Sequence, residues 1–577
     1  MQRLLSFLRP HWQLVAALIG LNLLIAVLLV ISPIVIKQVV DEVIAKQNLA
    51  GLPTYLGIIV AVAALRAAAL LGYQVGRERL GQTVITDIRT ALYRKLLALH
   101  WGYYDNERTG SLMSRMIGDV ESTRIFLSGI LIDSVNQVTT IVLLLAGFAQ
   151  QDLTLALIAA VPTCIYGITL YLLFAERREI QLKIHQQSAV VNATLQDSLS
   201  GVKVVKAFAQ EPQEFKKFDR DIKLLAELNI RSNRVWNLRN PWVSGMTRLM
   251  QLTLILVGGL RVMNGEISLG TLVAALAFAN LMMVPVQQLG QQMTALGQTA
   301  SAAMRIFQTL DEPIAIKSPA MPLAAGDELR GDIRFENVSF KYPKTNSYVL
   351  KHINLHVPAG TSLALVGATG AGKSTLANLI PRFYDPITGS LKIDNIDVRE
   401  MDLSALRRHI AIVSQDPLLF SASIAENIAF GRVDATQATI ERAAKLAQAH
   451  TFITALPKGY ATVIGERGVG LSGGQKQRLA IARAILLDPR ILILDDSMSA
   501  VDAETERLLQ LAFAEVMRGR STLLIAHRLS TVSQADQIMV LRNGQIVEQG
   551  SHNQLFAASG YYREILEMQR MSTESIT

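Results

Sequence analysis

The sequence has 577 residues, half of them hydrophobic and 18% charged, and its formal net charge is +9. This length exceeds what one hydrophobic core serves, so we expect at least two domains; the low charged fraction indicates that part of the chain lies in lipid. The sequence holds one cysteine, Cys164, which excludes an internal disulfide and a cysteine-clustered metal site. Because Cys164 lies within an apolar run, we expect it to be a small packing residue.

Six apolar stretches precede residue 310, at 12–36, 53–76, 128–148, 153–174, 246–264 and 268–290. Each is near the roughly 20 residues that a helix needs to cross a bilayer, and the first is too long for the core of a signal peptide. After residue 310, short apolar runs alternate with helical and glycine-rich segments, the pattern of an α/β domain. We therefore predict a bundle of six transmembrane helices at 1–310, a linker at 311–330 and an α/β domain at 331–577.

Basic residues concentrate in two long connections between the apolar stretches. Residues 77–127 and 175–245 are rich in arginine and lysine, whereas the opposite connections are short and nearly free of both. The positive-inside bias therefore places both long connections and both termini in the cytoplasm. Both connections have the pattern of long helices that extend from the membrane. This clustering indicates an anionic membrane face, and we expect no nucleic-acid partner.

The first ten residues are expected to form a short interfacial helix. In that helix, apolar side chains would face lipid (Leu4, Leu5, Phe7 and Leu8) and cations would face lipid phosphate (Arg3 and Arg9). Further along, several polar residues lie within the apolar stretches: Asn22, Arg66, Asp133, Asn136, Gln137, Arg248, Gln251 and Asn280. Because a polar group in lipid is costly, we expect these side chains either to line a transport path or to hydrogen-bond between helices.

The strongest motif runs from Gly367 to Ser374 and fits the phosphate-binding pattern G-x-x-x-x-G-K-[ST]. It follows a strand-like run at 362–366 and precedes a helix-like run at 374–380, which is the context that the motif requires. Its glycines allow backbone N–H groups to wrap the phosphates. Lys373 is expected to contact the β- and γ-phosphates, and Ser374 is expected to ligate magnesium.

Two further motifs follow in the α/β domain. A strand-like run at 491–494 ends in Asp495 and Asp496, and a carboxylate at the tip of a buried strand can hold magnesium directly or through water. Between the two strand motifs, Leu471-Ser-Gly-Gly-Gln475 opens a helix and forms a second anion cradle. Two phosphate cradles in one chain suggest that one of them serves a nucleotide held by another copy.

Together these motifs resemble those of the ATP-binding cassette (ABC) family, in the exporter type with six membrane helices and one P-loop ATPase motor per chain. The sequence GATGAGKST resembles the family's Walker A motif, ILILD its Walker B motif and LSGGQ its signature. Four single residues match its adenine-stacking aromatic, Q-loop, D-loop and switch histidine, in that order: Tyr342, Gln415, Asp502 and His527. Residues 465–468 resemble the segment that contacts the membrane loops in exporters.

The resemblance implies a site for ATP and Mg2+. It implies nucleotide contacts from Tyr342, Gly367, Gly370, Gly372, Lys373, Ser374, Thr375, Ser472, Gly473, Gly474, Gln475 and Asp502. The metal ligands would be Ser374, Gln415 and Asp495, and the catalytic groups would be Asp496, Gln415 and His527.

The resemblance also implies a working assembly. Two motors would sandwich two ATP molecules, each between one chain's Walker A motif and the other chain's LSGGQ. The implied partners are therefore a second half-transporter, the lipid bilayer of a bacterial plasma membrane, and a hydrophobic or amphipathic substrate. Segments near 103–106 and 208–211 resemble the coupling helices that rest on the motors.

One position departs from the family pattern, which has glutamate where this chain has Asp496. Aspartate is one methylene shorter, so its carboxylate is retracted by ~1.5 Å, and misplacement of this order can cost ~10²-fold in rate. One hypothesis is that this chain is the degenerate partner of a heterodimer, with a slow site of its own and an intact signature for the partner's site. The other is a homodimer that uses Asp496 as a weaker catalytic carboxylate.

Other functional classes agree less well with the sequence. A soluble cassette ATPase shares the motor but lacks six spans, and an importer usually keeps its membrane and motor parts on separate chains. A channel or regulatory protein with a cassette motor stays open, as does the choice among drugs, lipids and lipid-linked substrates. Three methionines on or near the sixth span either form an adaptable apolar surface or pack between helices: Met282, Met283 and Met293.

Overall fold

The computed structural model describes residues 2–323, 329–343, 345–465, 470–496, 503–526, 532–558 and 560–574. The chain divides into two compact units. The membrane unit comprises Met1–Leu97 and Thr109–Glu312, and the motor unit comprises Ala98–Arg108 and Pro313–Thr577. The short segment Ala98–Arg108, which interrupts the membrane unit in sequence, therefore packs with the motor.

The membrane unit is helical, as predicted. Within the described residues, six helical stretches are long and apolar enough to cross a membrane, and they coincide with the six predicted spans. The principal helices are α2 (Trp12–Gln38), α3 (Leu52–Ala98), α7 (Leu131–Gln151), α8 (Leu153–Ser200), α10 (Glu211–Met263) and α11 (Leu269–Asp311). Two spans begin at side-chain caps, because Asp152 accepts a hydrogen bond from the Leu155 N–H and Ser268 accepts one from the Thr271 N–H.

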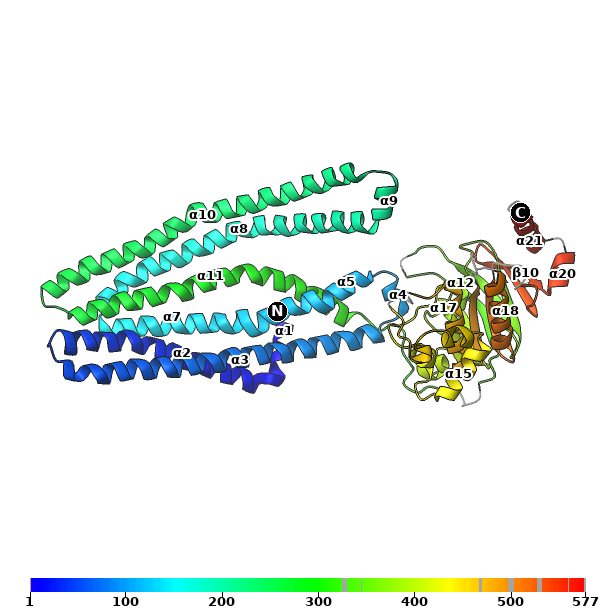
Figure 1. Cartoon of the computed structure of the whole chain (residues 1–577), viewed down its shortest axis with the longest axis horizontal. Helices are drawn as coiled ribbons and strands as arrows, with labels where there is room; N and C mark the ends of the chain where they lie inside the picture. The colour runs from blue at the N-terminus through cyan, green and yellow to red at the C-terminus, as the bar shows by residue number, and fades with distance from the viewer. Residues whose placement is uncertain are drawn as a thin grey trace. The chain divides into compact units, whose positions relative to one another are not determined.

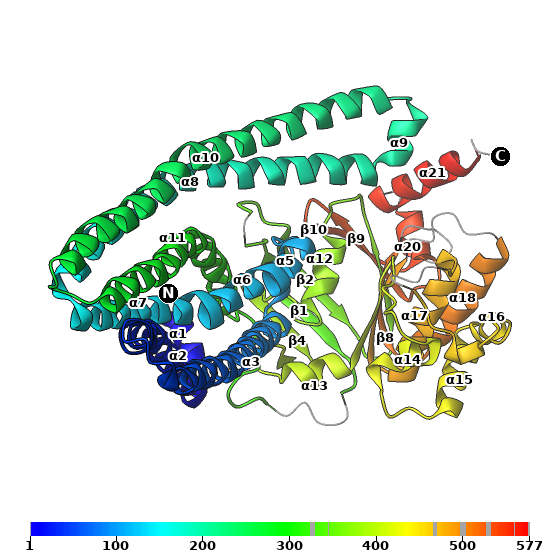
Figure 2. The same cartoon turned by 60° about the vertical axis from the view of Figure 1, so that its left-hand side comes forward.

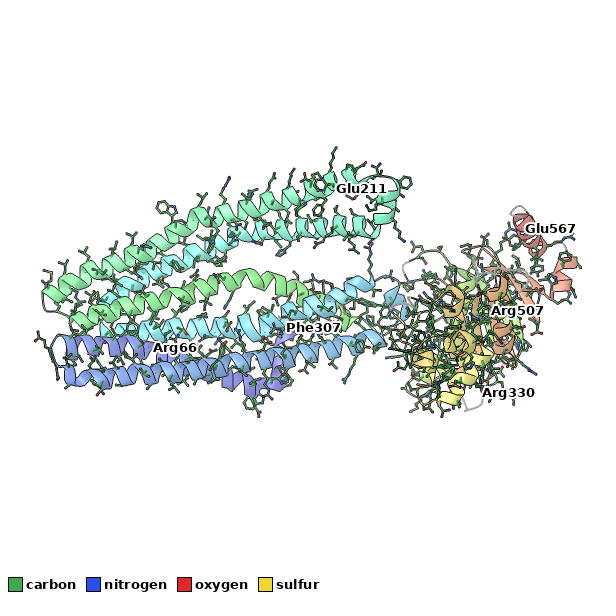
Figure 3. The ribbon with its side chains drawn as sticks, viewed as in Figure 1. Arg66, Glu211, Phe307, Arg330, Arg507 and Glu567 are labelled. Carbon is green, nitrogen blue, oxygen red and sulfur yellow. The ribbon has the colours of Figure 1, made fainter. Side chains whose placement is uncertain are left out.

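Several helices continue far beyond their apolar parts, as the basic connections indicate. Helices α8 and α10 pack along each other and are joined by the short helix α9 (Val202–Ala207). Toward α9 this pair diverges from α7 and α11 (Figures 1 and 2). Glu211, at the start of α10, marks the far end of the pair (Figure 3).

The third span is preceded by short helices and π-helical turns. These are α5 (Thr109–Ser114), a π-helical turn at Arg115–Asp119, α6 (Val120–Arg124) and a second π-helical turn at Ile125–Ile130. A similar turn, Val39–Ile44, extends α2 at its C-terminal end.

Side chains within the spans mostly bond between helices. Asp133 accepts hydrogen bonds from the Tyr73 hydroxyl at 2.5 Å and from Arg77 at 3.0 Å. Gln137 donates to Gln288, and Gln251 donates to Asn280 at 2.5 Å. These contacts favour the helix-bonding interpretation for the residues concerned. Arg248 is exposed on the surface of this chain.

The apolar packing of the membrane unit resolves two further expectations. Met282 is fully buried beside Phe278 and Met250, so it packs between helices and forms no adaptable surface. The rings of Phe148 and Phe278 stack with centroids 5.5 Å apart in the same cluster. Cys164 is exposed, so the expectation that it is a packing residue is wrong for this chain.

The N-terminal segment packs on protein, in contrast to the prediction that its apolar face meets lipid. It consists of α1 (Gln2–Leu5) and a 3-10 helix at Ser6–His11. Leu4 is fully buried in a cluster that includes Ile306, and Arg3 binds Asp311 at 2.5 and 2.7 Å. The Arg3 guanidinium also lies 4.3 Å from the ring centroid of Phe307. An apolar pattern alone does not distinguish lipid from a neighbouring helix.

The motor unit contains two sheets. The antiparallel sheet has the order β2-β1-β4-β5, and the other sheet has the order β10-β9-β3-β8-β7-β6, in which the five strands from β9 to β6 are parallel. The strands are β1 (Ile333–Phe340), β2 (Leu350–Val357), β3 (Ser362–Val366), β4 (Thr388–Ile393), β5 (Ile396–Asp397), β6 (Ile410–Val413), β7 (Ile491–Asp496), β8 (Ser521–Ala526), β9 (Gln537–Arg542) and β10 (Gln545–Gly550).

Helices cover both faces of the parallel strands. The described helices of the motor unit are α4 (Trp101–Tyr104), α12 (Lys373–Leu379), α13 (Leu403–Arg408), α14 (Ile424–Ile428), α15 (Gln437–Leu446), α16 (His450–Thr454), α17 (Gly473–Leu487), α18 (Ala503–Met517), α20 (His552–Ala557) and α21 (Tyr561–Glu574). Successive strand residues point to opposite faces, and in β3 Leu363 and Leu365 join the cluster of α12, whereas Ala364 and Val366 join that of α17 and α18. Helices α12 and α17 therefore pack on opposite faces of the sheet.

Candidate nucleotide-binding site

The predicted phosphate loop connects β3 to α12, in the predicted strand–loop–helix context. A Cβ atom on Gly367 would lie 2.3 Å from the Leu541 carbonyl oxygen, a distance that real Cβ atoms essentially never show. Gly370 and Gly372 have φ angles of +83° and +105°, which other residues adopt only with strain. The loop conformation thus requires glycine at each of these three positions.

Lys373 lies in the curve of this loop. Its side chain is only 6% exposed, and its ammonium group donates hydrogen bonds to the carbonyl oxygens of Gly367 at 2.7 Å and Ala368 at 3.1 Å. Burial lowers the pKa of Lys373, and the nearby Asp495 carboxylate opposes this shift. The loop therefore holds a largely desolvated cation among backbone groups, an arrangement suited to a polyphosphate.

Tyr342, the predicted adenine-stacking residue, lies beside the helix that follows the loop. Its hydroxyl group is 2.9 Å from the Thr375 hydroxyl group. Its ring makes edge contacts with Phe340 and Tyr384, with centroids 5.1 and 5.3 Å away. The structure thus brings together the aromatic residue and the phosphate loop, which are separated in sequence.

The paired carboxylates end β7, which is separated from β3 by β8. Asp495 is in register with Ile525, and Asp496 is in register with Ala526, the last residue of β8. His527 follows Ala526 in sequence, but His527 and Asp502 lie outside the described residues, as does the side chain of Asp496.

The predicted Q-loop residue and metal-ligating serine are both accessible. Gln415 is exposed, two residues beyond the end of β6, and its backbone oxygen accepts a hydrogen bond from Gln477 at 3.5 Å. Gln477 belongs to α17, so Gln415 is connected to the helix that the signature motif opens. Ser374 is also exposed, at the start of α12.

The signature motif caps α17. Ser472 accepts a hydrogen bond from the Gln475 N–H at 3.3 Å, and the Gln475 side chain accepts one from the Ser472 N–H at 2.9 Å. Ser472 and Gly473 are exposed, and Gly474 is buried. Because α17 and α12 cover opposite faces of the sheet, the two predicted anion cradles of this chain belong to different sides of the motor.

A cavity of about 80 Å³ lies between α2 and α3 in the membrane unit. Its lining is apolar except for Ser32 and Arg66. The Nε atom of Arg66 is buried without a hydrogen-bond partner in the described structure. This cavity therefore combines an apolar wall with a cation, and the sequence pattern did not distinguish Arg66 from the other polar residues of the spans.

Comparison with known proteins agrees with this architecture. Residues 15–286 match the family described as "ABC transporter transmembrane region", and residues 350–499 match "ABC transporter". The chain is 36% identical to a putative multidrug export ATP-binding/permease protein, YgaD of Bacillus subtilis, over 99% of this chain and all of that protein. It is also 36% identical to an ATP-dependent lipid A-core flippase of Desulfotalea psychrophila, over 92% of this chain and 93% of that protein.

A solved structure has the same fold over nearly its whole length. It is that of a bacterial Atm1-family ABC exporter with ATP bound, which superposes with a TM-score of 0.81 at 29% identity, covering 97% of this chain and 98% of that chain. This chain belongs to the ABC transporter family, as a half-transporter with one membrane domain and one ATPase domain. It is thus an integral membrane protein whose motor binds ATP and couples ATP hydrolysis to transport.

Proposed function

We propose that this chain exports hydrophobic or amphipathic molecules by alternating access, as one half of a dimer. Its relatives carry the names of a multidrug exporter and a lipid A-core flippase, which supports cargo of this kind. In this proposal residues 1–310 carry the transport path, 311–330 form a linker and 331–577 form the motor, with the motor and both termini on the cytoplasmic side of a bacterial plasma membrane.

The motor residues have distinct roles in this proposal. Tyr342 stacks on adenine, Lys373 binds the β- and γ-phosphates, and the glycines of the loop wrap the phosphate chain. The oxygen atoms of Ser374, Gln415 and Asp495 are the ligands that magnesium prefers, and a bound Mg2+ would neutralise charge on the phosphates. Asp496, Gln415 and His527 would orient the attacking water.

The second cradle serves another chain in this proposal. Ser472, Gly473, Gly474 and Gln475, together with Asp502, would contact the ATP held by the partner's Walker A motif. The exposure of Ser472 and Gly473, on the face of the sheet opposite α12, supports this assignment. Each ATP site would then combine residues of two chains.

The partner is a different half-transporter, and the observation that carries this proposal is Asp496. The family pattern has glutamate at this position, whereas the signature that would serve the partner's site is intact. A shortened carboxylate therefore slows the site built on this chain's Walker motifs and leaves the other site unaffected. The alternative is a homodimer in which Asp496 serves both sites.

Two substitutions in turn distinguish the heterodimer from the homodimer. In a heterodimer, Ser472→Arg nearly abolishes ATPase activity because bulk and charge block closure on the partner's ATP, whereas Asp496→Asn leaves most of the activity. In a homodimer, either substitution removes most of it. ATP binding is measured beside the rate, because loss of Asp496 can also weaken magnesium binding. Brisk ATPase activity of the purified chain alone that Asp496→Asn abolishes would end the heterodimer proposal.

Transport itself is tested in inverted membrane vesicles. ATP-dependent uptake of the amphipathic dye Hoechst 33342, lost with Lys373→Ala, is the expected result for an exporter. ATP hydrolysis without concentrative uptake of the dye or of a fluorescent phospholipid would instead favour a channel or regulatory protein.

A further inference from the structure

A segment of five residues, Pro381–Asp385, follows α12 after one intervening residue. Its second residue, Arg382, is only 6% exposed and has a φ angle of +52°. A residue other than glycine in this left-handed conformation carries strain, which surrounding contacts must offset. The segment makes contacts with three other parts of the motor unit.

The first contact is with the proposed adenine site. The ring of Tyr384 packs edge-on against that of Tyr342, with centroids 5.3 Å apart and planes at 90°. Phe340 packs against both tyrosines, at 5.1 Å from Tyr342 and 5.4 Å from Tyr384. Tyr384 is only 5% exposed, so its ring has little room to move independently of Tyr342.

The second contact is with Ala98–Arg108, which the chain connects directly to α3 on one side and to α5 on the other. The Tyr384 hydroxyl donates a hydrogen bond to the Asp105 carboxylate. Beside it, the rings of Phe383 and Trp101 stack at 5.0 Å with planes 16° apart. Burial and the Asp105 carboxylate raise the pKa of Tyr384, so its hydroxyl stays protonated and able to donate.

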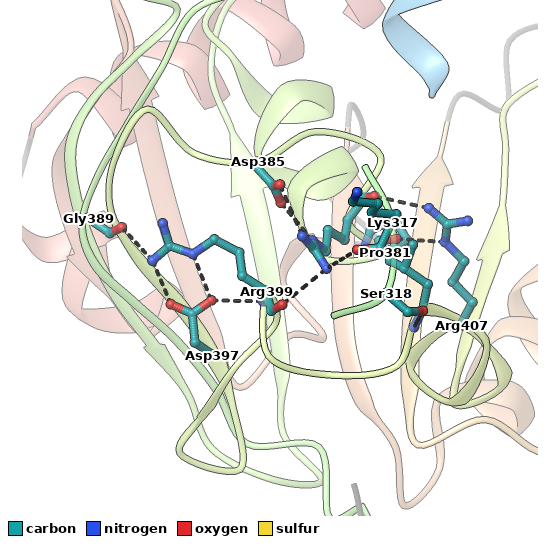
Figure 4. Close-up of polar contacts among 10 residues, drawn as sticks. Lys317, Ser318, Pro381, Asp385, Gly389, Asp397, Arg399 and Arg407 are labelled. Atoms are coloured by element: carbon teal, nitrogen blue, oxygen red, sulfur yellow. Dashed lines mark hydrogen bonds and ion pairs between the residues drawn. The ribbon is translucent and has the colours of Figure 1, made fainter. Parts of the chain in front are cut away.

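The third contact is with the chain that follows α11. Arg382 donates to the carbonyl oxygen of Lys317 at 3.4 Å and to the Asp385 carboxylate at 2.8 Å (Figure 4). Next to Lys317, Ser318 donates to Asp402 at 2.8 Å. The same five residues therefore contact both segments of the motor unit, Ala98–Arg108 and the chain after Glu312, from which the chain continues into the membrane unit.

We infer that Tyr384 is a positioning residue that links adenine binding at Tyr342 to the position of Ala98–Arg108. The link has two parts: the edge contact between the tyrosine rings and the hydrogen bond from the Tyr384 hydroxyl to Asp105. A nucleotide that stacks on Tyr342 would fix the position of that ring. Tyr384 contacts the Tyr342 ring and hydrogen-bonds to Asp105, so it connects the nucleotide to Asp105. The inference rests on the proposed function, because it assumes that Tyr342 contacts adenine.

Tyr384→Phe tests the hydrogen bond while retaining the ring contact with Tyr342. The assembled transporter is reconstituted in lipid nanodiscs, with nitroxide labels on Arg94→Cys of α3 and Lys216→Cys of α10 in a Cys164→Ala chain. Pulsed electron spin resonance measures the distance between the labels with and without ATP, Mg2+ and vanadate. This measurement requires no cargo, so it is decided independently of the substrate.

In Tyr384→Phe we expect ATP to bind as in the parent, while the ATP-induced change in label distance is largely lost. A hydrogen bond to a charged group is strong enough that its loss should reduce the population that changes its label distance about tenfold. The KM for ATP should stay within about twofold, since the ring that contacts Tyr342 remains. Tyr384→Ala removes the ring as well, and it should raise the KM in addition.

Two substitutions at Asp105 provide the matched controls. Asp105→Ala removes the acceptor and should behave like Tyr384→Phe, whereas Asp105→Asn keeps an acceptor oxygen and should behave more like the parent. A full ATP-induced distance change in both Tyr384→Phe and Asp105→Ala would overturn the inference. A rise in KM in Tyr384→Phe that matches the lost distance change would also overturn it, because that is the behaviour of a purely structural residue. A parent that changes distance but takes up no dye contradicts the proposed function and leaves this test valid.

Discussion

Replacing single glycines of the phosphate loop by alanine separates close packing from backbone strain. At Gly370 an added Cβ meets nothing within 4 Å, so alanine suffers only from the positive φ of +83°, at a cost of about 1 kcal/mol. At Gly367 the added Cβ meets the Leu541 carbonyl oxygen at 2.3 Å and the Ala371 Cβ at 3.3 Å. The backbone of β9 must then shift, which costs about 3 kcal/mol or more.

Thermal unfolding of the full-length chain without nucleotide measures both effects. For a domain of this size about 1 kcal/mol corresponds to a shift of roughly 2–4 °C, so we expect about 3 °C for Gly370→Ala and about 9 °C for Gly367→Ala. The measurement follows the unfolding of the motor by limited proteolysis during heating. Equal shifts, or a larger shift for Gly370→Ala, would show that the proximity of Leu541 does not determine the requirement for glycine.

Two further predictions follow from individual side chains. Tyr342→Ala should weaken nucleotide binding by about 1–3 kcal/mol, because the ring that stacks on adenine is lost. Tyr342→Phe keeps the ring and loses only the hydroxyl contact with Thr375, so it should weaken nucleotide binding by about 1 kcal/mol. If titration calorimetry finds the larger loss of affinity for Tyr342→Phe, the hydroxyl group rather than the ring is responsible. In the membrane unit, Leu4→Ala should destabilise the protein by about 2–5 kcal/mol because Leu4 is fully buried. Its neighbour Leu5 is 43% exposed, and unfolding in detergent that is equally sensitive to Leu5→Ala would contradict the packing of this segment on α11.

Much of the architecture could be predicted because it depends on local pattern. A run of about 20 apolar residues has few alternatives to a membrane helix, and all six predicted spans are confirmed. The phosphate loop was placed correctly because its glycines, lysine and flanking strand all occur within a short stretch of sequence. Asp495 likewise lies near the end of a strand, β7, as its apolar run predicts, whereas its role as a magnesium ligand stays a prediction.

Features that depend on which surfaces meet were not predicted correctly. Leu4 has the same periodic pattern whether it contacts lipid or Ile306, so the sequence did not distinguish the two. Cys164 was expected to pack because its neighbours are apolar, yet in a membrane helix apolar residues also face outward. Tyr384 was missed altogether, because its partners Tyr342 and Asp105 lie 42 and 279 residues away in sequence.

The arrangement of the sheet also bears on the choice between heterodimer and homodimer. Alternate residues of β3 direct α12 to one face and α17 to the other, so the Walker A and signature motifs of this chain are on different sides of its sheet. If each ATP site combines motifs of two chains, a change beside Asp495 weakens only the site that carries this chain's Walker motifs. A homodimer would place the shorter Asp496 carboxylate in both ATP sites. Its rate of ATP hydrolysis would then be ~10²-fold lower than that of a transporter with glutamate at this position, because neither site is unaffected. The heterodimer that we propose would keep one complete site, and the test of that proposal is whether Asp496→Asn spares the ATPase activity that Ser472→Arg abolishes.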